Sequence, residues 1–256
     1  MPSPREQASR RLRDGVAAAA VALAGWQAVV WLTEVPPYIL PGPVRVATTL
    51  LAQYQLIAHH AAVTVAEVLL GIALGTLLGG LTALILMMSR MALRLVLPVL
   101  VFSQAVPVFA LAPLLTLWLG YGLGSKVAMA VLIIYFPVAS SFLDGLRHTE
   151  PGLLEMGRSF GATKRQLLLR IRVPAALPSF GSGLRLAAVY APIGAVIGEW
   201  VGASQGLGYL MLLANGRAKI DLMFAALIVL AVFTLILHKA VGILADRLTR
   251  RAKGLA

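Results

Sequence analysis

The sequence predicts an all-α, polytopic membrane protein with about six transmembrane helices. Of its 256 residues, 59% are hydrophobic and only 12% are charged. The mean hydropathy is +0.87, which is too apolar for a soluble domain with an ordinary ratio of surface to volume. Six spans of about 20 residues each would use roughly half of the chain. We therefore expect a single transmembrane domain over residues 1–256, with short loops.

The expected spans are the apolar stretches at residues 15–33, 61–88, 95–118, 126–144, 180–201 and 222–244. The first follows several arginines, as a signal peptide would, but its apolar run from Val16 to Leu32 is longer than a signal peptide needs. We interpret it as an uncleaved first helix. The second and third spans are separated only by residues 89–94.

Two connecting segments are longer than a bare turn requires. Residues 33–60 contain four prolines and then a segment that we expect to form an interfacial helix. Residues 145–179 are the most polar internal segment of the chain. We look for function in this second segment.

The basic residues predict the orientation. If the amino terminus is inside, the outer loops hold only Arg45, Lys126, Arg217 and Lys219, and Arg185 lies near the inner end of the fifth span. All other lysines and arginines of the 22 then lie inside. The positive-inside rule places both termini in the cytoplasm. Because the basic residues cluster between apolar runs, the net charge of +12 reflects membrane topology, and we expect no nucleic-acid partner.

The chain lacks the residues that several kinds of catalytic and metal-binding site require. The chain has no cysteine, so disulfides, thiol catalysis and cysteine-ligated metals are excluded. It has no G-x-x-x-x-G-K-[ST] phosphate loop, since Ala162 stands where the second glycine of the nearest match should be. His59 and His60 have no partners at metal-ligand spacing. We expect no catalytic site, no metal and no cofactor in this chain.

A motif with defined spacing lies in the polar segment. It reads Glu155-Met156-Gly157, three residues, Gly161, nine residues, then Ile171-Arg172-Val173-Pro174. Gly161 suits a backbone reversal between two short helices, and we expect the second helix to end before Pro174. This exposed helix would carry basic and leucine side chains that fit a groove in a partner protein. The alternative is an interfacial helix that lies on anionic lipid.

This motif resembles the EAA loop of permeases from binding-protein-dependent ABC importers of type I, with Met156, Gly157 and Val173 as departures from the pattern. The resemblance implies a permease of the bacterial inner membrane that works with two ATP-binding subunits, a second permease copy and an extracytoplasmic solute-binding protein. ATP would be bound by the partner ATPase. The residues implied in ATPase coupling are Glu155, Gly161, Lys164, Arg165, Leu168, Ile171 and Pro174. A homodimer of permeases is the simpler expectation.

The resemblance extends over about residues 60–245. Pro107, Pro113 and the Trp118-x-Gly120-x-Gly122 element are similar to the nitrate, sulfonate and taurine branch, as is Glu199 followed by Gly202-Ala-Ser-Gln-Gly-Leu-Gly208. Residues 197–202 and 221–226 look most like permeases for thiamine precursors of the hydroxymethylpyrimidine type. The resemblance thus implies import of a thiamine precursor, with taurine, alkanesulfonate or nitrate as the alternative.

Polar residues inside the spans are candidates for the translocation pathway. Ser103 and Gln104 lie beside a proline in the third span, and Glu199 lies near the outer end of the fifth. Hydrogen bonds between helices would explain Gln104 equally well. For Ser103, and for Ser140 and Ser141 in the fourth span, we favour such hydrogen bonds. For Glu199 we favour a gating or structural role over contact with the solute.

A different class, the ion-coupled secondary transporter, needs titratable groups at mid-membrane and usually internal repeats. The two glutamates in the spans, Glu67 and Glu199, both lie toward the ends of their spans, and the sequence has no evident repeat. The glycines Gly71, Gly75 and Gly79 recur on one helix face and predict close helix packing.

Overall fold

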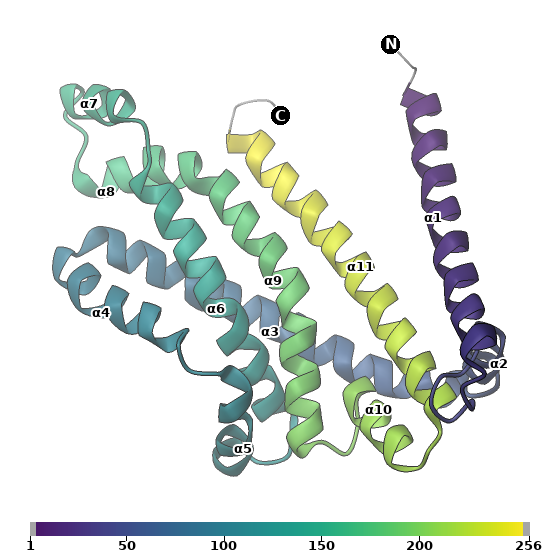
Figure 1. Ribbon diagram of the computed structural model, residues 1–256. Helices are drawn as coiled ribbons and strands as arrows, with labels where there is room; N and C mark the ends of the chain where they lie inside the picture. The colour runs from purple at the N-terminus through teal and green to yellow at the C-terminus, as the bar shows by residue number, and fades with distance from the viewer. Residues whose placement is uncertain (1–3, 253–256) are drawn as a thin grey trace. The chain divides into compact units, whose positions relative to one another are not determined.

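The computed structural model describes residues 4–252, with side chains from residue 13 to 250, and this part of the chain is helical without strands (Figure 1). Five helices are long and apolar enough to span a membrane, and the pair α4 and α5 makes a sixth if counted as one span. The prediction of an all-α protein with about six spans is confirmed. The side chains of Arg5, Arg10, Arg11, Arg251 and Lys253, which entered the orientation argument, lie outside the described residues.

The helices follow one another with short connections. In chain order they are α1 (Pro4–Thr33), α2 (Pro43–Ala52), α3 (Tyr54–Met88), α4 (Arg90–Ser103), α5 (Val108–Leu119), α6 (Leu123–Arg147), α7 (Pro151–Ser159), α8 (Lys164–Leu167), the π-helical turn η1 (Leu168–Arg172), α9 (Val173–Gly202), α10 (Leu207–Gly216) and α11 (Ile220–Ala252). The short helix expected after the prolines is α2. The short helix α10 was not predicted from the sequence.

The chain divides into two compact units. The first comprises Met1–Ala58 and Leu210–Ile228, and the second His59–Tyr209 and Val229–Ala256. Within the first unit, the ring of Trp26 on α1 stacks on Phe224 with centroids 5.6 Å apart. The assignment of the whole chain to one domain stays a prediction.

Helices α6 and α9 pack along each other and form the centre of the second unit. Helix α3 joins them through its glycine face, because a Cβ atom at Gly71 would lie 2.5 Å from Cβ of Ala130 and one at Gly75 would lie 2.6 Å from Ile134. Only glycine allows this approach, so the predicted packing face is confirmed. The core between these helices is made by Val68, Ile134, Val138, Ala187, Ala188, Ala191, Ala195 and Leu237.

The third predicted span is broken. Helix α4 begins directly after Ser89, whose side chain accepts a hydrogen bond from the N–H of Ala92. The axes of α4 and α5 differ by 100° across the break between them. Pro107 occupies the residue before α5 and lacks an N–H for a helix that would continue through it, while its ring disfavours helical backbone at the preceding residue. The side chains of Ser103 and Gln104 are exposed at this bend.

The polar segment ends differently from our expectation. We predicted that Pro174 would stop the helix that follows Gly161, and this was wrong. Residues Lys164–Gly202 form one helix without a break. Pro174 lies in the first turn of α9, directly after the π-helical turn. The wider hydrogen-bonding pattern of that turn accommodates a residue without an N–H, as first-turn positions do.

Candidate functional site

The motif in the polar segment folds as a turn followed by a capped helix. Gly161 has φ of +74° and open space around its α-carbon, so glycine is required here for its conformation and not for lack of room. The Thr163 side chain then accepts from the N–H of Gln166 at 3.3 Å, and the Gln166 side chain accepts from the N–H of Thr163 at 2.8 Å. This reciprocal capping box begins α8.

The predicted coupling residues fall into two groups. Glu155, Lys164 and Arg165 are exposed, whereas Ile171 and Pro174 are half-buried. Leu168 is only 5% exposed and belongs to a core cluster with Leu143. The expectation that Leu168 faces a partner is therefore not met in this structure, because the π-helical turn directs it into the core of the second unit.

Gly157, a departure from the usual alanine of the EAA pattern, is buried against the second half of the motif. A Cβ atom there would lie 2.7 Å from both Ile171 and Leu167 side chains. The glycine thus lets α7 approach the π-helical turn closely. The departure from the pattern has a local packing reason.

A basic cavity of about 870 Å³ lies between this motif and the junction of α3 and α4. Arg172 is anchored at its wall, since its guanidinium donates to the carbonyl of Leu146 at 2.6 Å. No acidic side chain lines the cavity among the described residues. Its basic lining residues are Arg90, Arg158, Lys164, Arg165 and Arg172. The surface is suited to an acidic partner.

A second cavity, of about 470 Å³, opens at the bend between α4 and α5. Gln104 lines it together with Ser140 and Ser141 of α6 and Tyr190 of α9. Ser103 is not part of its wall, and the Ser103 hydroxyl donates instead to the carbonyl of Leu100 at 2.7 Å. The structure therefore groups Gln104 with the two serines, which we had expected to make only interhelical hydrogen bonds.

Glu199 lies apart from this cavity, in a buried cluster at the other end of α9 from the coupling motif. It is 1% exposed. One carboxylate oxygen accepts from the hydroxyl of Thr64 at 2.6 Å, and the other accepts from the N–H groups of Gly208 and Tyr209. These N–H groups belong to the first turn of α10. The N–H groups of a first turn have no carbonyl acceptor within their own helix. Glu199 therefore caps α10 from a neighbouring helix, and the helix dipole favours a negative charge at this end.

Two side chains of α3 complete the cap. His60 Nδ1 accepts from the N–H of Gly206 at 3.0 Å, and Thr64 accepts from the N–H of Leu207 at 2.7 Å. Gly206 has φ of +110°, and a Cβ atom there would lie 2.2 Å from the Glu199 carboxyl carbon. The glycine-rich element after the fifth span is thus shaped around the carboxylate.

Lys126 lies in the first turn of α6 and is 1% exposed, which corrects our expectation that it belongs to an outer loop. Its ammonium donates to the carbonyl of Tyr121 at 2.6 Å and to the carbonyl of Gly202. Gly202 is the last residue of α9. A cation at the carboxyl end of a helix is favoured by the unpaired carbonyls and the dipole.

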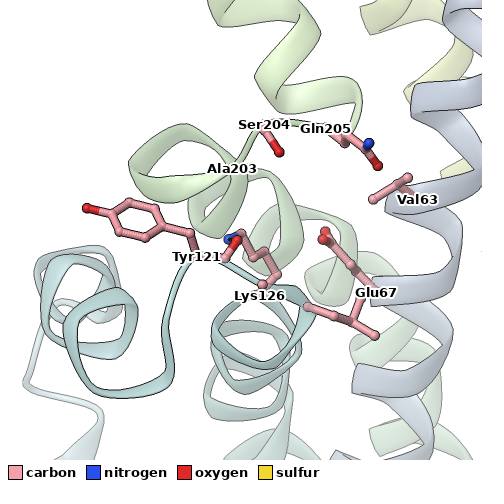
Figure 2. A pocket seen from close by; sticks show the side chains of 9 residues that line it. Val63, Glu67, Tyr121, Lys126, Ala203, Ser204 and Gln205 are labelled. Atoms are coloured by element: carbon pink, nitrogen blue, oxygen red, sulfur yellow. Dashed lines mark hydrogen bonds between the residues drawn. The ribbon is translucent and has the colours of Figure 1, made fainter.

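Glu67 adjoins Glu199 and completes the group of buried ionisable side chains. It is 2% exposed, and its Oε2 has no hydrogen-bond partner among the described residues. A cavity of about 270 Å³ lies between Glu67 and Lys126 and is also lined by Ser204 and Gln205. Figure 2 shows the Glu67 carboxyl group turned toward this space, with the nitrogen end of the Lys126 side chain on the side of Tyr121.

Sequence reasoning singled out Glu199 but not the partners that surround it. His60, Thr64 and Glu67 stand at positions i, i+4 and i+7, so they share one face of α3. Three polar side chains on one face of an otherwise apolar span were the signal that could have identified them. Lys126 had no such signal, because a lysine at the edge of an apolar stretch is usually solvated.

Comparison with known proteins finds similarity over most of the chain. Residues 71–254 match the family described as "Binding-protein-dependent transport system inner membrane component". The chain is 51% identical to a probable ABC transporter permease protein of Haemophilus influenzae, over 87% of this chain and 91% of the relative. It is 45% identical to the formylaminopyrimidine transport permease protein ThiX of Halalkalibacterium halodurans, over 68% of this chain and 70% of the relative.

A solved structure has the same fold. The chain aligns with the MetNI methionine ABC transporter in an inward-facing conformation, with a TM-score of 0.67 and 20% identity, covering 78% of this chain and 98% of that one. At this identity the likeness concerns the fold alone.

Proposed function

Because the chain belongs to the family of inner membrane components of binding-protein-dependent transport systems and is the permease subunit of an ABC importer, we propose that its cargo is a pyrimidine precursor of thiamine. The relative ThiX is named for transport of formylaminopyrimidine. The resemblance of residues 197–202 and 221–226 to thiamine-precursor permeases supports the same substrate class.

The observation that carries the permease mechanism is the continuous helix from Lys164 to Gly202. Its first residues are exposed and basic, and they adjoin the basic cavity. We assign this end to docking of a separate ATP-hydrolysing subunit, with Glu155, Lys164 and Arg165 in contact and Gly161 setting the turn. Leu168 would act from inside, by fixing the docking segment to the permease core. The chain itself would carry no catalytic group.

The translocation pathway is assigned to the cavity at the bend of the third span. Gln104, Ser140, Ser141 and Tyr190 supply donors and acceptors there, and irregular backbone is tolerated in membranes where it lines such a cavity. Two permease copies, two ATPase subunits and a solute-binding protein would complete the importer. Both termini would face the cytoplasm, which places the coupling segment on the ATPase side.

The test of the substrate is uptake of labelled hydroxymethylpyrimidine by cells that express this permease with its ATPase and binding protein. Saturable, ATP-dependent uptake that excess taurine leaves unchanged is the expected result. If the partners assemble and ATP is hydrolysed, but pyrimidine does not enter, the pyrimidine assignment is wrong. Uptake of taurine or an alkanesulfonate in its place would assign the chain to that substrate class.

A further inference from the structure

We propose that the cavity beside Glu67 is a binding site of the permease for a small solute that offers an N–H donor to Glu67 and an acceptor to Lys126. An aminopyrimidine has this pattern, because its amino group adjoins a ring nitrogen. The inference rests on the proposed function and assigns to the permease a part in choosing the solute, in addition to the binding protein.

The first argument is the unpaired oxygen of Glu67. A buried carboxylate oxygen without a hydrogen-bond donor is costly in a folded protein and is found at few places in native structures. Oε2 of Glu67 is such an atom among the described residues, and the carboxyl group is directed into the cavity (Figure 2). A donor on a bound solute would remove the cost.

The second argument is that the neighbouring groups have little bonding capacity left. Both oxygens of Glu199 already accept hydrogen bonds. Lys126 uses two of the three donors of its ammonium group, on Tyr121 and Gly202. The cluster therefore offers the cavity one acceptor on Glu67 and one donor on Lys126, and a ligand must supply the complement of each.

The third argument is the balance of donors and acceptors. Two carboxyl groups and one ammonium group lie together out of solvent, and the oxygen that they leave unpaired, Oε2 of Glu67, is an acceptor. A solute that brings a donor satisfies this oxygen, whereas an alkanesulfonate without an amine brings only acceptors. Taurine carries an ammonium group as well as its sulfonate, so it is the competitor that a test must include.

The fourth argument is size. The cavity of about 270 Å³ is slightly smaller than the usual range for small-molecule sites, about 300–1,000 Å³. It admits a single aromatic ring with short substituents. A flavin or another multi-ring solute would exceed it.

The experiment measures equilibrium binding to the purified permease–ATPase complex in lipid nanodiscs, without nucleotide and without the binding protein. The probes are labelled hydroxymethylpyrimidine, which carries a ring amino group, and its deamino analogue. We expect the wild-type complex to prefer the amino compound. Glu67→Gln should lower the affinity for the amino compound about tenfold, because the glutamine amide can present an N–H donor where Oε2 of Glu67 offers an acceptor, and should bring the two probes close to equal affinity.

The matched control is Glu34→Gln, which neutralises an exposed carboxylate outside the cluster and should leave both affinities unchanged. A structural role of Glu67 would instead weaken both probes equally, and that result would overturn the site. So would an absence of saturable binding in a complex that transports the pyrimidine. If taurine bound more tightly than the pyrimidine, and if this binding depended on Glu67, the ligand of the site would be an aminosulfonate and not an aminopyrimidine.

Discussion

At the scale of single residues, the positions with the strictest requirements surround Glu199. Two carboxylate oxygens serve three donors there, and Gly206 and Gly208 approach too closely for any side chain. The arrangement explains why a carboxylate is tolerated near the end of an apolar helix. The Glu199 carboxylate takes the place of water as the hydrogen-bond acceptor for the first turn of α10.

Gly206→Ala should be among the most damaging single substitutions in the chain. Its Cβ would overlap the Glu199 carboxyl group, and its φ of +110° is unfavourable for alanine. We expect a loss of roughly 3 kcal/mol or more of stability, measured as a lower thermal midpoint of the purified permease and less protein in the membrane. Gly216→Ala, where nothing lies within 4 Å, is the control, and equal behaviour of the two variants would contradict the cap.

At the scale of elements, the coupling segment shows what a spacing motif can and cannot predict. The spacing located Gly161 and its turn correctly, because a positive φ is a local property that favours glycine. It did not reveal that Leu168 is buried, since the direction of that side chain is set by a π-helical turn, which has no sequence signature of its own. It also misplaced the effect of Pro174, because the π-helical turn before it accommodates a residue without an N–H.

Gly161 should be replaceable by asparagine but not by alanine. Alanine in the left-handed region costs about 1–2 kcal/mol, whereas asparagine is tolerated there more often. We expect Gly161→Ala to reduce copurification of the ATPase and solute uptake, and Gly161→Asn to retain more of both. Gly152→Ala, on the exposed surface of α7, is the control. Full coupling in Gly161→Ala would show that the turn is not needed.

Glu155→Lys and Leu168→Ala should fail in different ways. The first reverses an exposed charge, so the permease should reach the membrane with normal stability but lose ATPase binding. The second removes a buried side chain and should cost about 2–5 kcal/mol of stability, measured by thermal unfolding. If Leu168→Ala left stability unchanged and abolished only ATPase binding, Leu168 would be a contact residue after all.

At the scale of the whole molecule, hydropathy predicted the spans because lipid requires each crossing helix to be apolar and hydrogen-bonded within itself. Hydropathy is averaged over a window of residues, and this averaging did not reveal three features. It merged α4 and α5 into one span, it assigned Lys126 to a loop, and it gave no sign of α10. For Lys126 and α10 the decisive interactions are between residues far apart in the sequence, such as Lys126 and Gly202, whereas the break between α4 and α5 follows locally from Pro107.

The orientation can be tested because the chain has no cysteine. Single cysteines at the exposed positions Ser159 and Ser204 would be labelled with a membrane-impermeant maleimide. We expect Ser204→Cys to react in intact cells and Ser159→Cys to react only after the membrane is opened, since the basic segment should face the cytoplasm. The reverse pattern would invert the topology.

The uninterrupted helix from Lys164 to Gly202 is about 58 Å long, at 1.5 Å per residue for its 39 residues. Its two ends are the basic docking segment and the carbonyl held by Lys126. In such a rod, a tilt of about 5° displaces one end by about 5 Å relative to the other, which is more than the length of a hydrogen bond. A small rotation imposed by ATPase closure would therefore break the bonds around Glu199 and Lys126 directly, by leverage, with no relay of side chains in between.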